Sequence, residues 1–251
     1  MPFQPACSIA EVSDRLGSIA AWAVANDSRL GYFAALYKVV TDEVIAEVDQ
    51  GNFKDGARLE RLDVGFANLY FQALWNFLSG KGPVPGCWSL TFDAARRNDR
   101  LILQHVILGI HAHINHDLGI AAATIPSDPG FQEDFDYLNE ILGRLLDRVE
   151  AVLGQHSPLL RIGDVLLLRS DEAILNFSLR RARDEAWHFS RYLAGCSPSE
   201  QVALLEQLDI RTRVLSRVLL DPPPPLSSAV DMVRWQERED LPAVIQSLLG
   251  A

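Results

Sequence analysis

Apolar residues recur every three or four positions along most of the chain, the spacing that places side chains on one face of an α-helix. One stretch shows the pattern well: Leu30, Phe33, Leu36, Tyr37, Val40, Val44 and Val48. The pattern predicts helices over residues 9–26, 29–49, 57–79, 88–96, 99–121, 131–154, 171–194, 200–220 and 228–249. The one strand-like run, residues 165–168, is too short and too isolated to carry a sheet, so the predicted fold class is all-α.

Several residues predict where individual helices begin or end. Ser8 and Glu11 have the Ser-x-x-Glu spacing of a capping box, so a helix is expected to start there. Asp99 is expected to be the N-cap of the helix over residues 99–121 or to lie in its first turn. Pro242 is expected to kink or break the last helix.

The arrangement of these helices follows from the most apolar one. The segment 99–121 is apolar on nearly all sides, which suits burial against several neighbours. We therefore predict a multi-helix bundle of roughly seven to nine mostly antiparallel helices around it. Residues 1–220 are expected to form a single helical domain. Residues 221–251 are expected to form a Pro-rich spacer and a C-terminal helix that docks on the body or on a partner.

Composition narrows the class of protein. The chain is 48% hydrophobic and 22% charged, which is typical of a folded rather than a disordered protein. Its net charge of −10, without a run of Lys or Arg, argues against nucleic-acid binding. The three cysteines are widely spaced and indicate neither a disulfide framework nor a Cys-rich zinc site. Because we find no signal peptide and no membrane span, we expect a soluble cytoplasmic protein. Its oligomeric state is not predicted.

The candidate chemistry is concentrated in the central helix. Four of the six histidines, His105, His111, His113 and His116, lie within twelve residues of that apolar segment. Buried imidazoles and carboxylates are costly unless they are paired, hydrogen-bonded or bound to metal. Residues three and four apart share a helix face, so His113, His116 and Asp117 are expected to project together.

Three interpretations of this cluster stay open at the level of sequence. His113 and Asp117 have the i, i+4 spacing that suits one divalent transition metal, with Asp63 as a further ligand and His116 as an alternative one. The same residues would also suit a metal-free site that binds or converts a small molecule. In the third interpretation the imidazole and the carboxylate bond each other and only stabilise the fold.

Two further polar residues interrupt apolar helix faces. Asp63 lies in the middle of a predicted helix, where Asp is a poor helix former. It is expected either to pair with Arg58 or Arg61 at the surface, or to face inward as a ligand or as a partner of His113. Tyr37 is expected to fill core space or to bring its hydroxyl to a pocket.

The predicted helix over residues 171–194 carries further candidates. Glu185 and His188 have the Glu-x-x-His spacing of di-iron bundles, but the motif occurs once instead of twice, which favours a surface pair. Arg183 is expected to stack on Trp187 or to pair with an acidic residue such as Asp134.

A family resemblance rests on several short segments of the chain. The most specific segment is Ala112-His113-Ile114-Asn115-x-Asp117-Leu118. The others are Glu60-Arg-Leu-Asp-Val64, Phe66-Ala-Asn-x-Tyr70, Trp88 with Phe92, Asp134-Phe135, and Arg183 with Ala186-Trp187. Over about residues 30–195 the chain resembles an uncharacterised family, catalogued as domain of unknown function 5995. The resemblance implies an all-helical domain, and it implies no known reaction. The shared polar residues that it implies are Asp63, His113, Asn115 and Asp117.

Our first functional hypothesis is an enzyme that acts on a small, largely apolar molecule. His113 would be a metal ligand or a general base, and Asp117 and Asp63 would be co-ligands or would orient the imidazole. Asn115 would hydrogen-bond the substrate or support the loop that follows. With a divalent metal, hydrolysis by metal-activated water is the simplest chemistry. The alternatives are a non-catalytic helical binding or scaffold module with a structural His/Asp/Asn network, and a metal-free cyclase or isomerase of specialised metabolism.

Overall fold

The computed structural model describes residues 3–126, 129–157, 179–237 and 239–251, and every regular element in this part of the chain is a helix. The prediction of an all-α fold is confirmed. The strand-like run at 165–168 and the first residues of the helix predicted over 171–194 lie outside the described residues. The elements are α1 (Ile9–Ala25), α2 (Leu30–Asp49), α3 (Gly56–Ser79), α4 (Gly86–Ala95), α5 (Ile102–Ala112), the π-helical segment η1 (His113–Leu118), α6 (Gly119–Ala123), α7 (Pro129–His156), α10 (Leu179–Ala194), α11 (Pro198–Leu220), α12 (Leu226–Gln236) and α13 (Leu241–Leu249).

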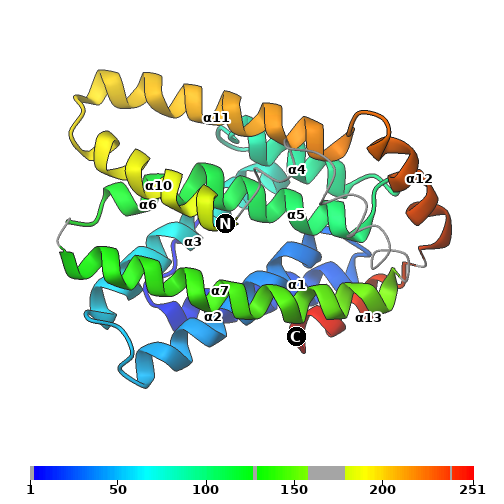
Figure 1. The fold of residues 1–251 in the computed structure, drawn as a ribbon, viewed down its shortest axis with the longest axis horizontal. Helices are drawn as coiled ribbons and strands as arrows, with labels where there is room; N and C mark the ends of the chain where they lie inside the picture. The colour runs from blue at the N-terminus through cyan, green and yellow to red at the C-terminus, as the bar shows by residue number, and fades with distance from the viewer. Residues whose placement is uncertain (1–2, 127–128, 158–178, 238) are drawn as a thin grey trace.

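The segment α5–η1–α6 lies in the middle of the bundle. Figure 1 shows α5 and α6 between α10 and α11 on one side and α2, α7 and α13 on the other. Apolar side chains of α5 are accordingly buried on several sides, among them Ile102, Val106 and Leu108. No helix in the described ranges is both long enough and apolar enough to cross a lipid bilayer.

The local signals for helix ends were partly correct. Ser8 is the N-cap of α1, and its hydroxyl accepts the backbone N–H of Glu11 at 3.2 Å. Asp99 is neither the N-cap of α5 nor part of its first turn, because the helix begins at Ile102, and its carboxylate instead binds Arg97. The cap residue is instead Leu101, whose N–H is accepted by the Gln104 side chain at 3.0 Å.

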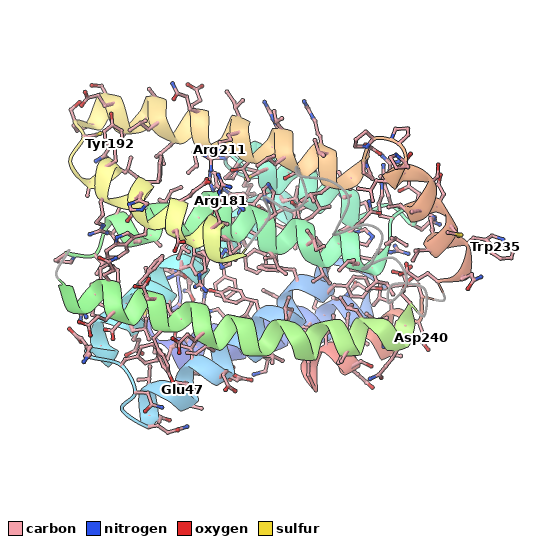
Figure 2. All side chains as sticks on the ribbon, in the orientation of Figure 1. Glu47, Arg181, Tyr192, Arg211, Trp235 and Asp240 are labelled. Carbon is pink, nitrogen blue, oxygen red and sulfur yellow. The ribbon has the colours of Figure 1, made fainter. Side chains whose placement is uncertain are left out.

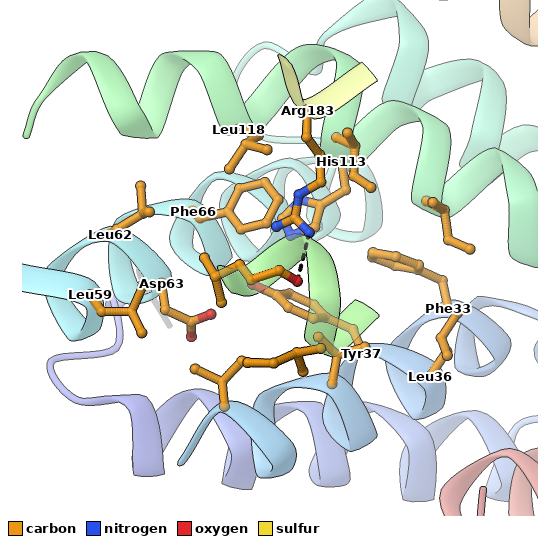
Figure 3. A pocket seen from close by; sticks show the side chains of 16 residues that line it. Phe33, Leu36, Tyr37, Leu59, Leu62, Asp63, Phe66, His113, Leu118 and Arg183 are labelled. Carbon is orange, nitrogen blue, oxygen red and sulfur yellow. Dashed lines mark hydrogen bonds between the residues drawn. The ribbon is translucent and has the colours of Figure 1, made fainter. Parts of the chain in front are cut away.

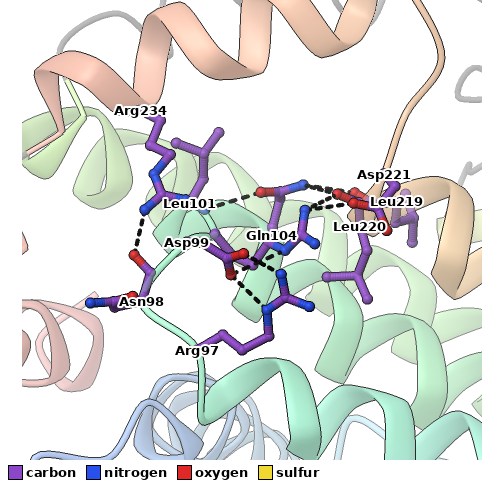
Figure 4. A network of polar contacts seen from close by, with 10 residues as sticks. Arg97, Asn98, Asp99, Leu101, Gln104, Leu219, Leu220, Asp221 and Arg234 are labelled. Atoms are coloured by element: carbon purple, nitrogen blue, oxygen red, sulfur yellow. Dashed lines mark hydrogen bonds and ion pairs between the residues drawn. The ribbon is translucent and has the colours of Figure 1, made fainter.

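The start of α5 is tied to the end of α11 by a polar network (Figure 4). Arg100 binds the carbonyl oxygen of Leu220 at 2.7 Å and the carboxylate of Asp221 at 2.8 Å. The Gln104 amide donates to the same carbonyl at 3.0 Å. Arg234 of α12 donates to the carbonyl oxygen of Asn98. The Pro-rich turn after α11 is therefore held against the central helix at several points.

The C-terminal segment forms two helices where the sequence predicts one. Pro242 lies in the first turn of α13, a position where its missing N–H costs no helical hydrogen bond, so the helix breaks before it. The apolar face of α13 is buried against α2. Gly31 allows this approach, since a Cβ atom there would lie 2.5 Å from Ile245 Cδ1.

Candidate functional site

The helix that carries the histidines changes its geometry at the candidate site. Residues His113–Leu118 form a π-helical segment, a rare conformation that is frequent at functional sites. Nδ1 of His113 lies 3.0 Å from Oδ2 of Asp117, and Nδ1 of His116 lies 2.7 Å from Oδ1 of the same carboxylate. The structure thus joins the three residues that the sequence places on one face.

Asp117 is the centre of this network. Its Oδ2 also accepts the indole N–H of Trp88 at 2.9 Å, and the residue is only 1% exposed. Burial favours the neutral acid, but the hydrogen bonds from His113 and His116 outweigh it and lower the pKa of Asp117 below its usual range. The carboxylate is therefore ionised and has both oxygens engaged. A divalent metal held by His113, Asp117 and Asp63 stays a prediction, and it would have to replace some of these bonds.

The two histidines bound to Asp117 differ in protonation. Burial opposes a charge on His116, but the hydrogen bond and charge of Asp117 outweigh burial and raise the pKa of that imidazole. For His113 burial dominates and lowers the pKa, so the ring is neutral. An ionised carboxylate only accepts hydrogen bonds, so His113 donates through Nδ1–H. Its other ring nitrogen, Nε2, then carries a free lone pair.

Aromatic rings fix the orientation of the His113 ring. It stacks on Phe66 with 3.5 Å between ring centroids and 8° between planes. Tyr37 lies 4.6 Å away, and Phe33 lies 5.5 Å away. Gly109 makes room for Phe33, because a Cβ atom there would lie 2.4 Å from its Cγ. The imidazole is held between two helices as well as by its hydrogen bond.

A cavity of about 90 Å³ lies beside His113, and we call it the His113 cavity (Figure 3). Side chains of α2, α3, α5, η1, α7 and α10 form its wall. The wall is apolar except for Tyr37, Asp63, His113 and Arg183. A mainly apolar hollow with a few converging polar groups is the usual form of a small-molecule site.

Each of these four polar side chains has a buried atom without a hydrogen-bond partner in the described part of the chain. These atoms are Tyr37 Oη, Asp63 Oδ2, His113 Nε2 and Arg183 Nε. Native proteins leave few such atoms, since each costs free energy unless water or a ligand satisfies it. Four of them border one small cavity, where water or a ligand would satisfy them.

Asp63 takes the inward position of the two that the sequence allowed. It forms no ion pair with Arg58 or Arg61 within the described ranges, and it lies on the wall of the cavity (Figure 3). Burial, with a smaller effect from the charge of Glu60, raises the pKa of Asp63 to about 7. Its carboxyl group is therefore able to hold or release a proton near neutral pH.

Asn115 lies away from the His113 cavity. Its side-chain N–H bonds Nδ1 of His111 at 2.9 Å, and the other ring nitrogen of His111 bonds the carbonyl oxygen of Thr212 at 3.0 Å. Asn115 lies on the wall of a separate hollow, beside Phe189 and Arg211. Asn115 and His113 therefore do not face the same cavity, and the geometry does not support the hypothesis that Asn115 hydrogen-bonds a ligand held by His113.

Arg183 is the site residue whose environment the sequence analysis placed wrongly. Its expected partner Asp134 instead binds Arg58 at 2.8 Å and accepts the backbone N–H groups of Lys54 and Asp55. Arg183 reaches into the His113 cavity (Figure 3). One signal was present in the sequence: Arg183 shares its helix face with Ala186 and Trp187, three and four residues later. These two residues are buried, so a charged side chain on the same face is directed into the protein.

Glu185 and His188 do not face the cavity. Glu185 pairs with Arg181 at 3.4 Å and with Arg211, and these contacts link α10 to α11 at the surface (Figure 2). His188 is exposed. The position of both residues agrees with the surface pair that the single Glu-x-x-His motif favoured.

One group of three potential metal ligands occurs among the described residues, and it shares only His116 with the predicted set. Ligand atoms of Cys87, His116 and Asp209 lie within 4.8 Å of one another. Asp209 already accepts the backbone N–H groups of Gly86 and Cys87, at 2.9 and 2.8 Å, and so caps α4. Burial, helped by the nearby carboxylates, raises the pKa of the Cys87 thiol. The known contacts of this group are those of a helix cap beside a buried thiol.

Comparison with known proteins gives a family for the chain. The model of the family of unknown function DUF5995 matches residues 9–222, a longer stretch than the segment 30–195 that carried the resemblance. The match takes in α1 and α11 as well as the elements around the His113 cavity. Comparisons with curated proteins and with solved structures find no match. The chain belongs to the DUF5995 family, and the activity has to be argued from the site itself.

Proposed function

We propose that the protein is an enzyme that moves a proton to or from a small, largely apolar molecule in the His113 cavity. His113 is the general base, and Asp117 is its positioning residue. One observation carries the proposal: Nε2 of a neutral, buried imidazole has no partner among the described residues and borders an apolar cavity. A positioned imidazole that is neutral at physiological pH suits general base catalysis.

The other polar groups have complementary roles in this proposal. Nε2 of His113 takes a proton from a C–H bond next to a carbonyl group, and the electron pair of that bond moves onto the carbonyl oxygen. The resulting imidazolium is stabilised by the Asp117 carboxylate at Nδ1. The oxygen accepts a hydrogen bond from the protonated carboxyl of Asp63 or from the hydroxyl of Tyr37, both of which border the cavity. Return of the proton to the same carbon completes an exchange of the C–H hydrogen. In a β,γ-unsaturated carbonyl compound, delivery of the proton to the γ-carbon instead shifts the double bond and completes an isomerisation.

The test uses butanone, a neutral ketone smaller than the benzene molecule that fits an engineered cavity of about 150 Å³ in another protein. We expect the protein in D₂O to exchange the C–H hydrogens beside the carbonyl faster than an equal concentration of free imidazole, as measured by proton NMR. His113→Gln should lower the rate by about 10²-fold or more. His188→Gln, which removes an exposed histidine on α10, is the matched control and should leave the rate unchanged. A rate no higher than that of imidazole rules the proposal out.

A second variant separates catalysis from a purely structural network. In Asp117→Asn the amide oxygen has to keep the position of Oδ2, which accepts the indole N–H of Trp88, so the amide N–H₂ group faces His116. His113 still donates through Nδ1–H, but the negative charge that stabilises its imidazolium is lost. We expect the exchange rate to fall by about 10²-fold or more while the fold persists. Nitrogen-15 NMR of the imidazole reports the tautomer directly. If the network only stabilises helix packing, wild-type exchange will equal that of imidazole, and the variant will change only the free energy of unfolding.

A further inference from the structure

Arg183 is a buried cation, and the described residues hold no anion paired with it. It is 4% exposed, and its one hydrogen bond to a described residue runs from Nη1 to the carbonyl oxygen of Leu138 at 3.3 Å. The guanidinium carbon lies 5.9 Å from the centre of the Phe135 ring. No carboxylate of the described residues lies within ion-pair distance of it, and its Nε has no partner there. The side chain reaches the His113 cavity, where Figure 3 shows it close to His113.

A guanidinium in this position is poised to bind a negative group. An unpaired buried charge costs several kcal/mol, and proteins normally compensate it with a counter-charge. Burial lowers the pKa of Arg183 to about 9, so the group still carries its charge at neutral pH. The planar N–H fork of arginine matches the two oxygens of a carboxylate. The ligand of the His113 cavity is the component that is able to supply them.

The remaining wall limits the ligand further. Arg183 is the one lysine or arginine among the described residues that line the cavity, and Asp63 adds negative charge when it is ionised. A phosphate dianion would therefore meet too little positive charge. The rest of the ligand faces apolar side chains such as Leu36, Val40 and Ile110. A volume of about 90 Å³ accepts only a short chain, since about 150 Å³ holds benzene.

We infer that Arg183 is the carboxylate subsite of the His113 cavity and that the ligand is a short-chain monocarboxylic acid with an apolar body. The inference rests on the proposed function for the claim that this ligand is the substrate. The subsite itself rests on the position of Arg183. The carboxylate at Arg183 places the carbon chain among the apolar side chains, within the same cavity as His113 and Asp63.

The experiment measures binding of propionate and of propionamide, its uncharged analogue of the same shape, by isothermal titration calorimetry at neutral pH. We expect wild-type protein to bind the acid at least about tenfold more tightly than the amide. Arg183→Met should remove this preference and leave amide binding unchanged. Arg183→Lys keeps the charge but loses the planar fork, so it should retain part of the preference. Arg181→Met, on the exposed side of the same helix, is the control and should behave as wild type.

Three results would overturn the inference: no binding of propionate to wild-type protein, equal binding of acid and amide, or a preference that survives in a folded Arg183→Met variant. Circular dichroism establishes that the variant is folded. The outcome is independent of the proposed chemistry, because His113→Gln keeps Arg183 and should still prefer the acid over the amide although its butanone exchange is slowed. Selective binding without butanone exchange would leave the subsite standing and reject the proton-transfer enzyme. Butanone exchange without a preference for the acid would support the proton-transfer enzyme and reject the carboxylate subsite.

Discussion

Two arginines of this protein are equally buried and yet belong to opposite kinds of environment. Arg58 is 6% exposed and binds the carboxylate of Asp134 at 2.8 Å, which also accepts two backbone N–H groups. Arg183 is 4% exposed and meets one carbonyl oxygen, an aromatic ring and the His113 cavity. Both guanidinium groups lie within the same helical bundle. Burial alone therefore does not distinguish a structural arginine from a functional one.

The partners of each arginine make the distinction. Around Arg58 the positive charge is matched within the protein by the carboxylate of Asp134, so no anion from a ligand is needed there. Around Arg183 four polar side chains keep atoms that nothing in the described chain satisfies. Such a region lowers the stability of the free protein and is retained where a ligand gains from it. The comparison predicts that substitutions in the two regions have effects of opposite sign.

The largest difference is expected between Arg58→Met and Arg183→Met. Loss of Arg58 leaves the buried Asp134 carboxylate without its counter-charge, which should lower the free energy of unfolding by about 3–5 kcal/mol. Arg183→Met leaves no carboxylate unpaired, so stability should be unchanged or higher. Urea denaturation at neutral pH measures both. Equal losses in the two variants would remove the basis of the comparison.

A double variant provides the control for this pair. Arg58→Met combined with Asp134→Asn removes the unpaired charge and keeps a side-chain oxygen for one of the N–H groups of Lys54 and Asp55, which bind different oxygens of Asp134. It should therefore be more stable than Arg58→Met alone. If the double variant is no more stable, packing of the arginine side chain, and not its charge, accounts for the loss.

The next effect tests the wall of the His113 cavity without touching its polar groups. A Cβ atom at Gly109 would lie 2.4 Å from Cγ of Phe33, so Gly109→Ala must displace that ring and should cost about 1–3 kcal/mol. Gly65→Ala is the matched control, because a Cβ atom at Gly65 of α3 would meet nothing within 4 Å. This control substitution should raise the free energy of unfolding by about 0.5–1 kcal/mol. A Gly109→Ala protein as stable as wild type would show that the wall yields easily.

The sequence predicted the fold better than the site, and the reason lies in the range of the interactions involved. Helical periodicity is a local property, so the positions of α2, α3 and α11 follow from their own residues. The break before α13 was expected only as a kink or interruption, because whether Pro242 ends or begins a helix depends on the segment before it. The family resemblance was confirmed over a longer stretch than its motifs covered.

The site depends on contacts between distant segments. His113 and Asp117 were identified because one helical turn separates them. Asp63 was left between a surface and an inward position, since the packing of α3 on α2 and α7 decides it. The π-helical geometry of His113–Leu118 has no simple sequence signal. Arg183 was expected to stack on Trp187 or to pair with an acidic residue such as Asp134, and only the three-dimensional structure reveals that Arg58 binds Asp134.

The variant Asp63→Asn tests whether the polar groups of the His113 cavity are desolvated, through the pH dependence of its free energy of unfolding. A carboxyl group whose folded-state pKa of about 7 lies above its usual 3.8 favours folding at low pH, and this contribution is lost as pH rises between the two values. The full shift corresponds to about 4 kcal/mol, and partial exposure of Asp63 reduces the expected effect to about 1–2 kcal/mol. The variant should be more stable than wild type at mildly alkaline pH and lose this advantage on acidification. Parallel stability curves from pH titration would contradict the inward, desolvated position of Asp63.

The smallest effect concerns two histidines outside the cavity that repeat the same contrast. Neither ring nitrogen of His105 has a partner among the described residues, whereas His111 bonds Asn115 and the carbonyl oxygen of Thr212. Burial lowers the pKa of each imidazole to about 4 from 6.5, so each contribution to stability is complete above 6.5 and is lost as pH falls towards 4.

His105→Leu should therefore raise the free energy of unfolding by about 1 kcal/mol at neutral pH and by more in acid, because the substitution removes buried polar atoms and leaves no partner behind. His111→Leu deprives Asn115 and Thr212 of a hydrogen-bond partner and should lower stability by a similar amount at neutral pH. Thermal unfolding measures whether the stabilities of the two variants change in opposite directions. If His105→Leu is destabilising, a buried group without partners is no sign of unused binding capacity in this bundle, and the argument for the His113 cavity loses its general support.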